Sequence, residues 1–228
     1  MKRLVIARHG NTFAKGETPT RVGARTDLEL VETTRARCVG EYLKENGLKP
    51  DRVYAAPLKR TLHTAEYALK QAGFDLPVAI EEGLREIDYG ADENKTEDAV
   101  VDRLGRLYLK KDGVENPTAE QIAQKGQEVI DAWNKNATLP DGWMADVNAM
   151  CAFWTDFAGK IAENETVFVV SSNGTIRFAP VITGDYDSFC AQNDIKVATG
   201  GVCVFENDGS GWKCAAWNVK PFKMYELS

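Results

Sequence analysis

The chain has 228 residues, of which 43% are hydrophobic and 27% are charged, values typical of a globular protein with one domain or two small ones. Its formal net charge of -6 argues against a general nucleic-acid-binding protein, because such proteins are usually basic. No stretch approaches the roughly 18 apolar residues of a membrane helix, so we expect neither nucleic acid nor a membrane as a partner.

The number and spacing of the cysteines and histidines argue against disulfide bonds and a metal site. The five cysteines are scattered without CxxC spacing, and the apolar run before Arg8 is too short for a signal-peptide core. We therefore expect reduced thiols and a cytoplasmic location. With only two histidines, and with an acidic stretch at 88–98 that lacks calcium-loop spacing, we expect no metal site.

The first part of the chain predicts alternating strands and helices. Residues 3–7 form a short apolar run typical of a buried strand, and a polar loop follows to about residue 27. Apolar residues recur at helical spacing over 32–45 and again after Pro57, which we place in the first turn of its helix. Further strands are predicted at 52–56 and 78–80.

The rest of the chain is mainly helical before it returns to strands. Residues 97–135 predict helix interrupted at 110–118, and 146–162 predict another helix. An apolar β-branched run at 167–170 predicts a strand that ends in a small-residue turn and leads toward a helix start. The segments 200–206 and 212–218 flank the turn sequence NDGSG and predict a hairpin.

This order of elements indicates an α/β fold. We expect a three-layer α/β/α sandwich with a mostly parallel central sheet and a helical insertion at about 91–145, over one end of the sheet. The sequence shows no linker, repeat or low-complexity tract, so we expect one domain over 1–228.

Ligands of such sheets bind beyond the carboxyl ends of the strands, where four loops of this chain carry polar residues. Arg8 and His9 end the first strand, followed by a glycine that allows close backbone approach. A neutral imidazole is a competent nucleophile toward phosphorus, and a guanidinium suits phosphate oxygens. The alternative for a lone histidine is a hydrogen-bonded turn residue.

Two more residues fit the same chemistry. Arg60 lies in the first turn of the second helix, where the helix dipole favours an anion, and Glu86 follows the third strand as a candidate proton donor. Taken alone, each has a simple alternative as a surface charge. His63 lies one turn beyond Arg60, and a helix-surface position is the preferred interpretation for it.

Together these segments resemble a known family. RHGNT, RVGARTDLELVETTRA, APLKRTLHTA, LREIDYG and VVSSNGTIR are similar, in this order, to the signatures of the phosphoglycerate mutase-like branch of the histidine phosphatase superfamily. The similarity extends over most of the chain. It implies that the substrate is a small phosphorylated metabolite, and by analogy alone it suggests a homodimer.

The resemblance implies a phosphohistidine mechanism. His9 would attack the phosphoryl group, Arg8 and Arg60 would bind its oxygens, and Glu86 would protonate the leaving group and then activate water. No cofactor is needed for such a transfer. The resemblance further implies substrate contacts for six other residues: Asn11, Thr12, Arg21, Arg25, Thr26 and Tyr89.

One loop departs from the family. Family members carry Ser-His-Gly after the fourth strand, and here we align it with Ser172, Asn173 and Gly174. Asn173 then replaces a second catalytic histidine, with Gly174 in the substrate site. An asparagine keeps an NH2 donor without the charge, so we expect a rate loss of roughly tenfold to a hundredfold. Two explanations for Asn173 remain open. It is either a natural residue suited to a substrate with its own positive charge, or a substitution introduced to trap a ligand.

Three functions follow from these features. The leading hypothesis is a phosphomonoesterase whose activity Asn173 would reduce, and the segment at 86–98 resembles phosphatase members more than mutases. A non-catalytic phosphate-ester-binding or regulatory protein is the alternative suggested by Asn173. A phosphoglycerate mutase-like phosphotransferase is the second alternative, and Tyr89 suits it. The sequence does not identify the leaving group.

Overall fold

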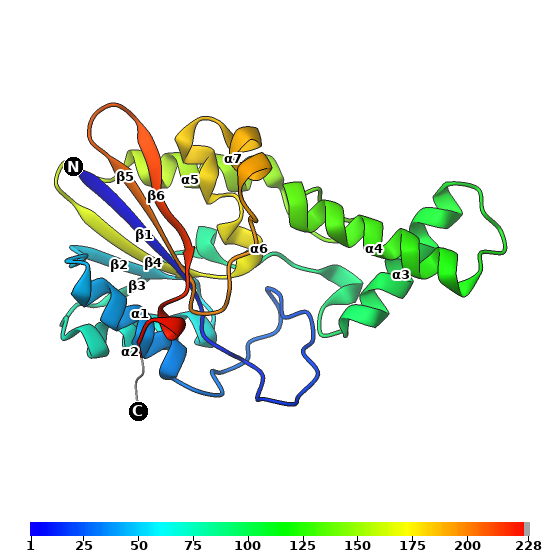
Figure 1. Cartoon of the computed structure of the whole chain (residues 1–228), viewed down its shortest axis with the longest axis horizontal. Coiled ribbons are helices and arrows are strands. Elements are labelled where there is room, and N and C mark those ends of the chain that lie inside the picture. The colour runs from blue at the N-terminus through cyan, green and yellow to red at the C-terminus, as the bar shows by residue number, and fades with distance from the viewer. Residues whose placement is uncertain (226–228) are drawn as a thin grey trace.

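The computed structural model describes residues 1–225, and at its centre is a six-stranded sheet (Figure 1). The strands lie in the order β3-β2-β4-β1-β5-β6. Their bounds are β1 Lys2–Arg8, β2 Arg52–Ala55, β3 Val78–Ile80, β4 Thr166–Ser171, β5 Val202–Asn207 and β6 Trp212–Val219. The first four strands pair in parallel, whereas β5 and β6 run antiparallel. The mostly parallel sheet and the hairpin predicted from the sequence are both confirmed.

Helices cover both faces of the sheet, which confirms the layered α/β architecture (Figure 1). They are α1 Thr34–Glu45 and α2 Lys59–Ala72 on one face, and α5 Val147–Gly159, α6 Asn173–Ile176 and α7 Tyr186–Gln192 on the other. Alternate residues of β1 serve the two cores. Val5 packs with the α1–α2 core, and Leu4 and Ile6 pack with the α5 core, so β1 is buried on both faces.

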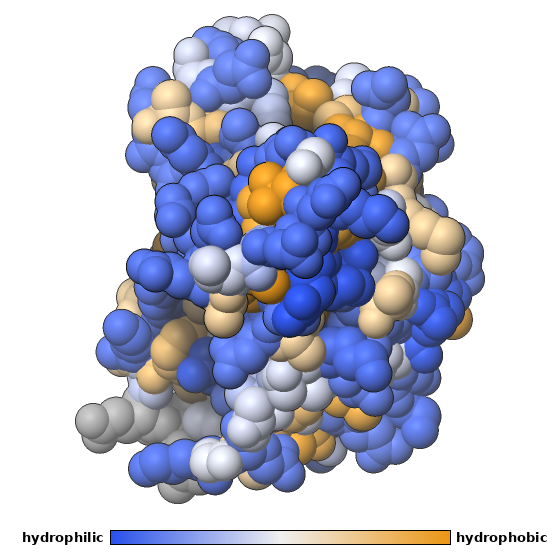
Figure 2. Space-filling view, turned by 90° about the vertical axis from the view of Figure 1, so that its right-hand side faces the viewer, coloured by the Kyte–Doolittle hydropathy of each residue, from blue (hydrophilic) through white to orange (hydrophobic). Residues whose placement is uncertain are grey.

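The helices α3 (Glu97–Lys111) and α4 (Ala119–Asn136) form a hairpin that projects from one end of the molecule (Figure 1). The interruption predicted at 110–118 is the connection between them. Two glycines allow their close approach, since a Cβ on Gly105 would lie 2.0 Å from the Ile122 carbonyl oxygen, and one on Gly126 would lie 2.0 Å from that of Val101. The end view in Figure 2 shows a mainly hydrophilic face with only small apolar patches.

Two local predictions need correction. The helix after Pro57 begins only at Lys59, with Leu58 as its N-cap in extended conformation, so Pro57 lies before the first turn. The sequence predicts no helix at α7, which has only seven residues and no fully buried side chain. Its apolar residues Tyr186, Phe189 and Cys190 pack partly buried against the core, but a stripe of about two turns is too short for apolar spacing to indicate a helix.

The parallel pairing brings the loops after β1, β2, β3 and β4 to one edge of the sheet. Arg8 is level with Ser171, and the Ala56 amide donates to the Val170 carbonyl oxygen. The polar residues that follow each strand therefore converge beyond the carboxyl ends. Within residues 1–225, no helix is both long and apolar enough to cross a membrane.

Candidate active site

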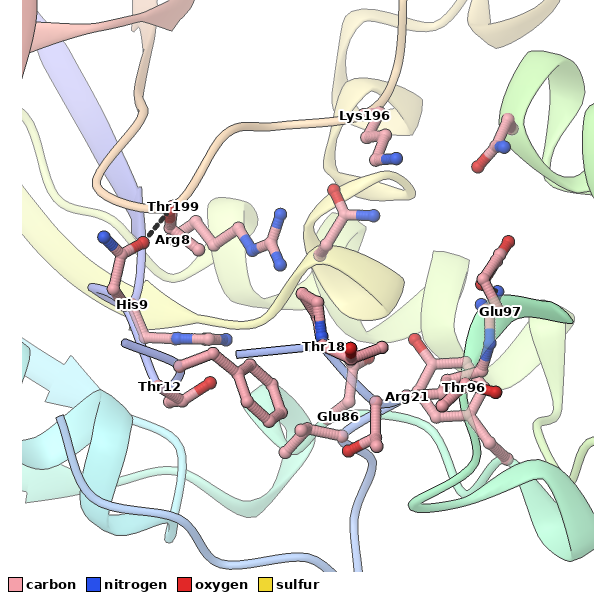
Figure 3. Close-up of a pocket in the computed structure, with 18 of the residues that line it drawn as sticks. Arg8, His9, Thr12, Thr18, Arg21, Glu86, Thr96, Glu97, Lys196 and Thr199 are labelled. Carbon is pink, nitrogen blue, oxygen red and sulfur yellow. Dashed lines mark hydrogen bonds and ion pairs between the residues drawn. The ribbon is translucent and has the colours of Figure 1, made fainter. Parts of the chain in front are cut away.

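His9 lies immediately after β1, and only 5% of its surface is exposed. Its Nδ1 is 2.8 Å from the carbonyl oxygen of Gly10. Because a carbonyl oxygen only accepts, Nδ1 carries the proton and Nε2 keeps its lone pair. Burial, aided by the charges of Arg60 and Arg8, lowers the pKa of His9 well below its usual value. His9 is therefore a neutral potential nucleophile on the wall of a cavity of about 750 Å³ (Figure 3).

Arg8 and Asn173 also line this cavity, and one backbone segment holds both. The Arg8 Nη1 donates to the Val197 carbonyl oxygen at 2.6 Å, and the Val197 amide donates to Asn173 Oδ1 at 2.8 Å. An amide N–H only donates, so the oxygen of the Asn173 side chain must face Val197. The Asn173 NH2 group thus remains for the cavity. The buried Nε of Arg8 has no partner within residues 1–225.

Glu86 is held by backbone amides beside the cavity and is only 6% exposed. Its carboxylate accepts hydrogen bonds from the Gly174 amide at 3.1 Å and from the Ile87 amide at 2.9 Å. A Cβ on Gly174 would lie 2.2 Å from Glu86 Oε1, closer than a carbon and an oxygen that are not bonded can approach. Gly174 therefore supports the Glu86 carboxylate through its backbone amide. Gly174 itself does not line the cavity.

Arg60 is fully buried but does not form part of the cavity wall. Its guanidinium donates to the Thr26 carbonyl oxygen at 2.7 Å and more weakly to the Gly23 carbonyl oxygen at 3.3 Å. It also lies 3.5 Å from Ser172 Oγ, and its Nε has no partner in the described chain. The charge of Arg60 lowers the pKa of His9 although its side chain is not exposed to the cavity. Its hydrogen bonds hold the loop at 23–26 in place.

Arg21 and Tyr89 lie on the cavity wall opposite Arg8 and His9, and Figure 3 shows Arg21 next to Glu97 there. Arg21 forms an ion pair with Glu97, and its guanidinium carbon lies 5.3 Å from the ring centre of Tyr89 and 4.6 Å from that of Trp143. Burial raises the pKa of Tyr89, so its hydroxyl stays protonated and can donate.

Asn11 and Thr12 line the cavity next to His9. Asn11 Oδ1 accepts a 2.6 Å hydrogen bond from Thr199 Oγ1, which ties the loop after β1 to the loop before β5 (Figure 3). Arg25 and Thr26 lie outside the cavity wall. Arg25 is largely exposed and paired with Asp88, and the Thr26 hydroxyl donates to Glu93.

The cavity also contains residues that the sequence analysis did not select. Among them are Trp133 and Asn134 from α4, Lys196 from the loop before β5, and Arg177 directly after α6. Arg177 was detectable because it lies four residues after Asn173 in a segment expected to begin a helix, a spacing that puts both side chains on one face. The residues of α4 carry no local signal, because only tertiary packing brings them to the site.

The register of β1 and β4 shows which residue of the loop after β4 lies level with His9, where the sequence alignment selected Asn173 as the residue that differs from the family. Arg8 is level with Ser171, and the His9 amide donates to the Ser171 carbonyl oxygen at 3.1 Å. The next residues along the two chains are His9 and Ser172, so Ser172 is the residue level with the nucleophile. Asn173 is one position further and begins α6.

The family follows from comparison with known proteins. The family model of the histidine phosphatase superfamily (branch 1) matches residues 4–142, more than half of the chain. The chain therefore belongs to the histidine phosphatase superfamily. It is 29% identical over 188 residues to a 2,3-bisphosphoglycerate-dependent phosphoglycerate mutase of Thermobifida fusca, covering 78% of this chain and 76% of that protein. It is also 26% identical to phosphoglycerate mutase 1 of Saccharomyces cerevisiae, over 98% of this chain and 91% of that one.

Solved structures share the fold at lower identity. A mycobacterial glucosyl-3-phosphoglycerate phosphatase in complex with inorganic phosphate superimposes with a TM-score of 0.64 at 19% identity, covering 97% of this chain and 99% of that chain. A phosphoserine phosphatase of Entamoeba histolytica in complex with 3-phosphoglyceric acid gives a TM-score of 0.64 at 20% identity, over 97% and 99% of the two chains.

Within residues 1–225, no group of three or more histidine, cysteine, aspartate and glutamate side chains is arranged to hold a metal ion.

Proposed function

We propose that the chain is a phosphomonoesterase that hydrolyses a small phosphorylated metabolite through a phosphohistidine on His9. The observation that carries the proposal is the state of His9. It is a buried neutral imidazole whose proton is held by the Gly10 carbonyl oxygen, with Arg8 beside it on the wall of the same cavity. The free thiols of the described chain are consistent with a cytoplasmic enzyme, which is part of the proposal.

The proposed reaction has two steps. His9 Nε2 attacks phosphorus, the bond to the alcohol oxygen breaks, and the Glu86 carboxyl group gives that oxygen a proton. Water then attacks phosphorus, Glu86 takes a proton from it, and the P–N bond breaks to release inorganic phosphate. In this proposal Arg8 and the Asn173 NH2 group donate to phosphoryl oxygens, which their position on the cavity wall with His9 supports, and the charge of Arg60 adds to the electrostatic stabilisation.

We further propose that Ser172 occupies the position from which a second histidine would reach the phosphoryl group. This rests on strand register, in which Ser172 is level with His9. Alignment of the loop on its glycine gave Asn173 instead. In the structure Asn173 already has a role, since its Oδ1 binds the segment that holds Arg8.

A mutase is the second candidate, favoured by the sequence relatives that are phosphoglycerate mutases. A mutase must return the phosphoryl group from His9 to a substrate, whereas a phosphatase transfers it to water. Tyr89 lies in the cavity and fits either role. A non-catalytic phosphate-ester-binding protein is the third candidate, because neither Ser172 nor Asn173 supplies an imidazole.

Phosphate release from p-nitrophenyl phosphate tests the proposal, from mildly acidic to neutral pH. The wild type, His9→Ala, Asn173→His and Ser172→His are compared. We expect turnover in the wild type, its loss in His9→Ala by a factor on the order of 10⁴ or more, and an increase in Ser172→His rather than in Asn173→His. Absence of turnover in all four proteins would refute hydrolysis of this ester.

Trapping the intermediate separates phosphatase from mutase. After mixing with a radiolabelled phosphate ester and quenching in alkali, which preserves phosphohistidine, label on His9 should decay to inorganic phosphate in water. Label that persists until a phosphoglycerate is added, and then moves to it, would show a mutase instead. Tight ester binding without any label would show a binding protein.

A further inference from the structure

The Gly10 carbonyl oxygen fixes the proton of His9, and Gly10 itself is bound by a residue from another part of the chain. The Gly10 amide donates a 3.0 Å hydrogen bond to Oγ1 of Thr64, which lies 54 residues further along the sequence. Thr64 belongs to α2, and its side chain is fully buried. It does not line the cavity, so any effect that it has on a ligand is indirect.

The partners of the Thr64 hydroxyl fix the direction of its two hydrogen bonds. A backbone amide only donates, so Thr64 Oγ1 accepts from Gly10. The hydroxyl hydrogen then goes to the Arg60 carbonyl oxygen, which lies 2.6 Å from Oγ1 and only accepts. The bond to Arg60 is the local one that a helical threonine makes to the carbonyl four residues earlier. The bond from Gly10 is the one that joins α2 to the loop after β1.

Gly10 has few other restraints. Within residues 1–225, Thr64 is the only hydrogen-bond partner of the Gly10 amide, and His9 Nδ1 is the only one of the Gly10 carbonyl oxygen. The backbone of His9 is bound on both sides, because its amide donates to Ser171 at 3.1 Å and its carbonyl oxygen accepts from the Gly200 amide at 3.0 Å. The position of the carbonyl oxygen that binds His9 Nδ1 therefore depends on Thr64.

The helix that carries Thr64 is a rigid support for this contact. Its buried stripe has residues spaced four apart, namely Arg60, Thr64, Ala68 and Ala72. At Ala68 it lies so close to α1 that a Cβ on Gly40 would be 2.1 Å from the Ala68 carbonyl oxygen. Thr64 is one turn from this close contact, so its position relative to the sheet is well defined.

Thr61 provides a comparison within the same helix. It is as fully buried as Thr64, and its hydroxyl lies 2.7 Å from both the Ala56 and the Leu58 carbonyl oxygens. Both acceptors lie between β2 and α2, and neither bond goes to the loop after β1. A buried threonine of α2 can therefore be satisfied without Gly10, which makes the bond from Gly10 particular to Thr64.

A change in the position of Gly10 would change the tautomer of His9. A neutral imidazole attacks phosphorus only through the nitrogen that carries no proton. Nε2 of His9 is that nitrogen as long as Nδ1 donates its proton to the Gly10 carbonyl oxygen. Without this acceptor the proton can occupy either nitrogen, and the fraction of the productive tautomer falls.

We propose that Thr64 is a positioning residue of the reaction. By binding the Gly10 amide, it places the Gly10 carbonyl oxygen that keeps the proton of His9 on Nδ1 and leaves Nε2 free to attack phosphorus. The effect of Thr64 on turnover rests on the proposed function, whereas its effect on the tautomer of His9 requires no activity.

Three substitutions in α2 test this role. Thr64→Val replaces the hydroxyl with a methyl group, Thr64→Ser keeps the hydroxyl, and Thr61→Val removes an equally buried hydroxyl that does not bind Gly10. Kinetics use p-nitrophenyl phosphate. Each substitution is also made in His63→Gln, where His9 is the single imidazole, and the 15N chemical shifts of its ring report the tautomer. Thermal unfolding checks that each variant is folded.

We expect the proton of His9 on Nδ1 in the parent protein, in Thr64→Ser and in Thr61→Val, and a mixture of tautomers in Thr64→Val. Since kcat/KM reports attack by His9, it should fall about 10- to 100-fold in Thr64→Val and less than about threefold in the other two. Inhibition by inorganic phosphate should stay the same in all of them. An unchanged tautomer in Thr64→Val, or an equal fall of kcat/KM in Thr61→Val, would overturn the inference.

The NMR measurement separates this inference from the proposed function. If none of these proteins turns over the ester, a change of tautomer confined to Thr64→Val upholds the positioning of His9 by Thr64, while hydrolysis of this ester is refuted. An unchanged tautomer refutes the positioning role in an active and in an inactive protein alike. If Thr64→Val does not fold, Thr64→Cys takes its place, because a thiol is a weaker acceptor, and a smaller change of tautomer is expected.

Discussion

The two ends of the cavity are built in different ways. The His9 end consists of residues that directly follow parallel strands, held by backbone groups such as the Gly10 carbonyl oxygen and the Gly174 amide. The Arg177 end consists of side chains from α4, from Arg177 directly after α6, from the loops at 18–22 and 89–96 and from the first turn of α3, and its arginines pack against aromatic rings. The first end is fixed by the sheet and suits chemistry that needs exact placement. The second depends on how the α3–α4 hairpin packs, and it suits selection among leaving groups.

We expect the largest effect on turnover from a change at Gly174, whose backbone amide binds the Glu86 carboxylate. Gly174→Ala places a methyl group 2.2 Å from Glu86 Oε1 and must displace the carboxylate. We expect turnover of an alkyl phosphate to fall about 10²- to 10⁴-fold, the usual contribution of general acid–base catalysis.

The same variant separates the two reaction steps. The p-nitrophenolate ion leaves without needing a proton, so Gly174→Ala should still release a burst of it and then stall as phosphoenzyme, measured by rapid mixing. Equal loss of the burst and the steady state would mean that the substitution damages the His9 end as a whole rather than Glu86.

The α3–α4 hairpin should be sensitive to packing in a way that the strand ends are not. Gly126→Ala puts a Cβ 2.0 Å from the Val101 carbonyl oxygen and forces the two helices apart. We expect a loss of about 1–3 kcal/mol in the free energy of unfolding, measured by urea denaturation.

Gly159→Ala is the matched control, because nothing lies within 4 Å of the added Cβ at the end of α5. It should be neutral or stabilising by up to about 1 kcal/mol. In buffer without urea, where Gly126→Ala remains folded, we expect the fold-increase in its KM to exceed the fold-decrease in its kcat. A fall in kcat alone would contradict the division of labour between the two ends.

Asn173 connects the two ends, since its Oδ1 binds the segment that positions Arg8 and its carbonyl oxygen accepts from Arg177. Asn173→Ala removes the acceptor for the Val197 amide and the NH2 donor, and we expect roughly a tenfold loss in kcat/KM. Asn173→Ser keeps a short hydrogen-bonding side chain and should lose less. Measured rates equal to wild type in Asn173→Ala would show that Arg8 needs no support from Val197.

The sequence predicts the His9 end far better than the Arg177 end, for a physical reason. In a parallel sheet, the residues that follow the strands must converge, so a correct strand assignment places Arg8, His9, Glu86 and Asn173 near one another without knowledge of packing. The positions of Arg25 and Thr26 were harder to predict, because a long irregular loop can turn a side chain outward, as Arg25 turns toward Asp88.

Two other features of the site depend on strand register and tertiary contacts, which the sequence does not reveal. Glycine alignment selected Asn173 as the departure from the family, whereas pairing of β1 with β4 makes Ser172 level with His9, a fact that requires the register. Trp133 lies on α4, which packs closely against α3 at two glycines more than twenty residues apart, and it reaches the cavity through such tertiary packing. No local pattern in α4 distinguishes a cavity residue from a core residue.

The smallest effect concerns pH, and it tests the neutrality of His9. Because burial and the neighbouring arginines lower its pKa in the folded protein, the unfolded chain takes up this proton first as pH falls. The stability contributed by neutral His9 is therefore complete above the unfolded value of about 6.5 and is lost progressively below it. Protonation of the nucleophile should likewise not limit kcat/KM between about pH 6 and 8.

An NMR titration of the ring in His63→Gln, which leaves His9 as the single imidazole, measures the pKa directly. We expect a neutral ring with the proton on Nδ1 throughout the range in which the protein stays folded, as the hydrogen bond to Gly10 requires. A titration near the usual histidine value, with an acidic limb in kcat/KM at the same pH, would mean that Arg8 and Arg60 do not act on the ring. The His9 end would then be more open to water than its burial indicates.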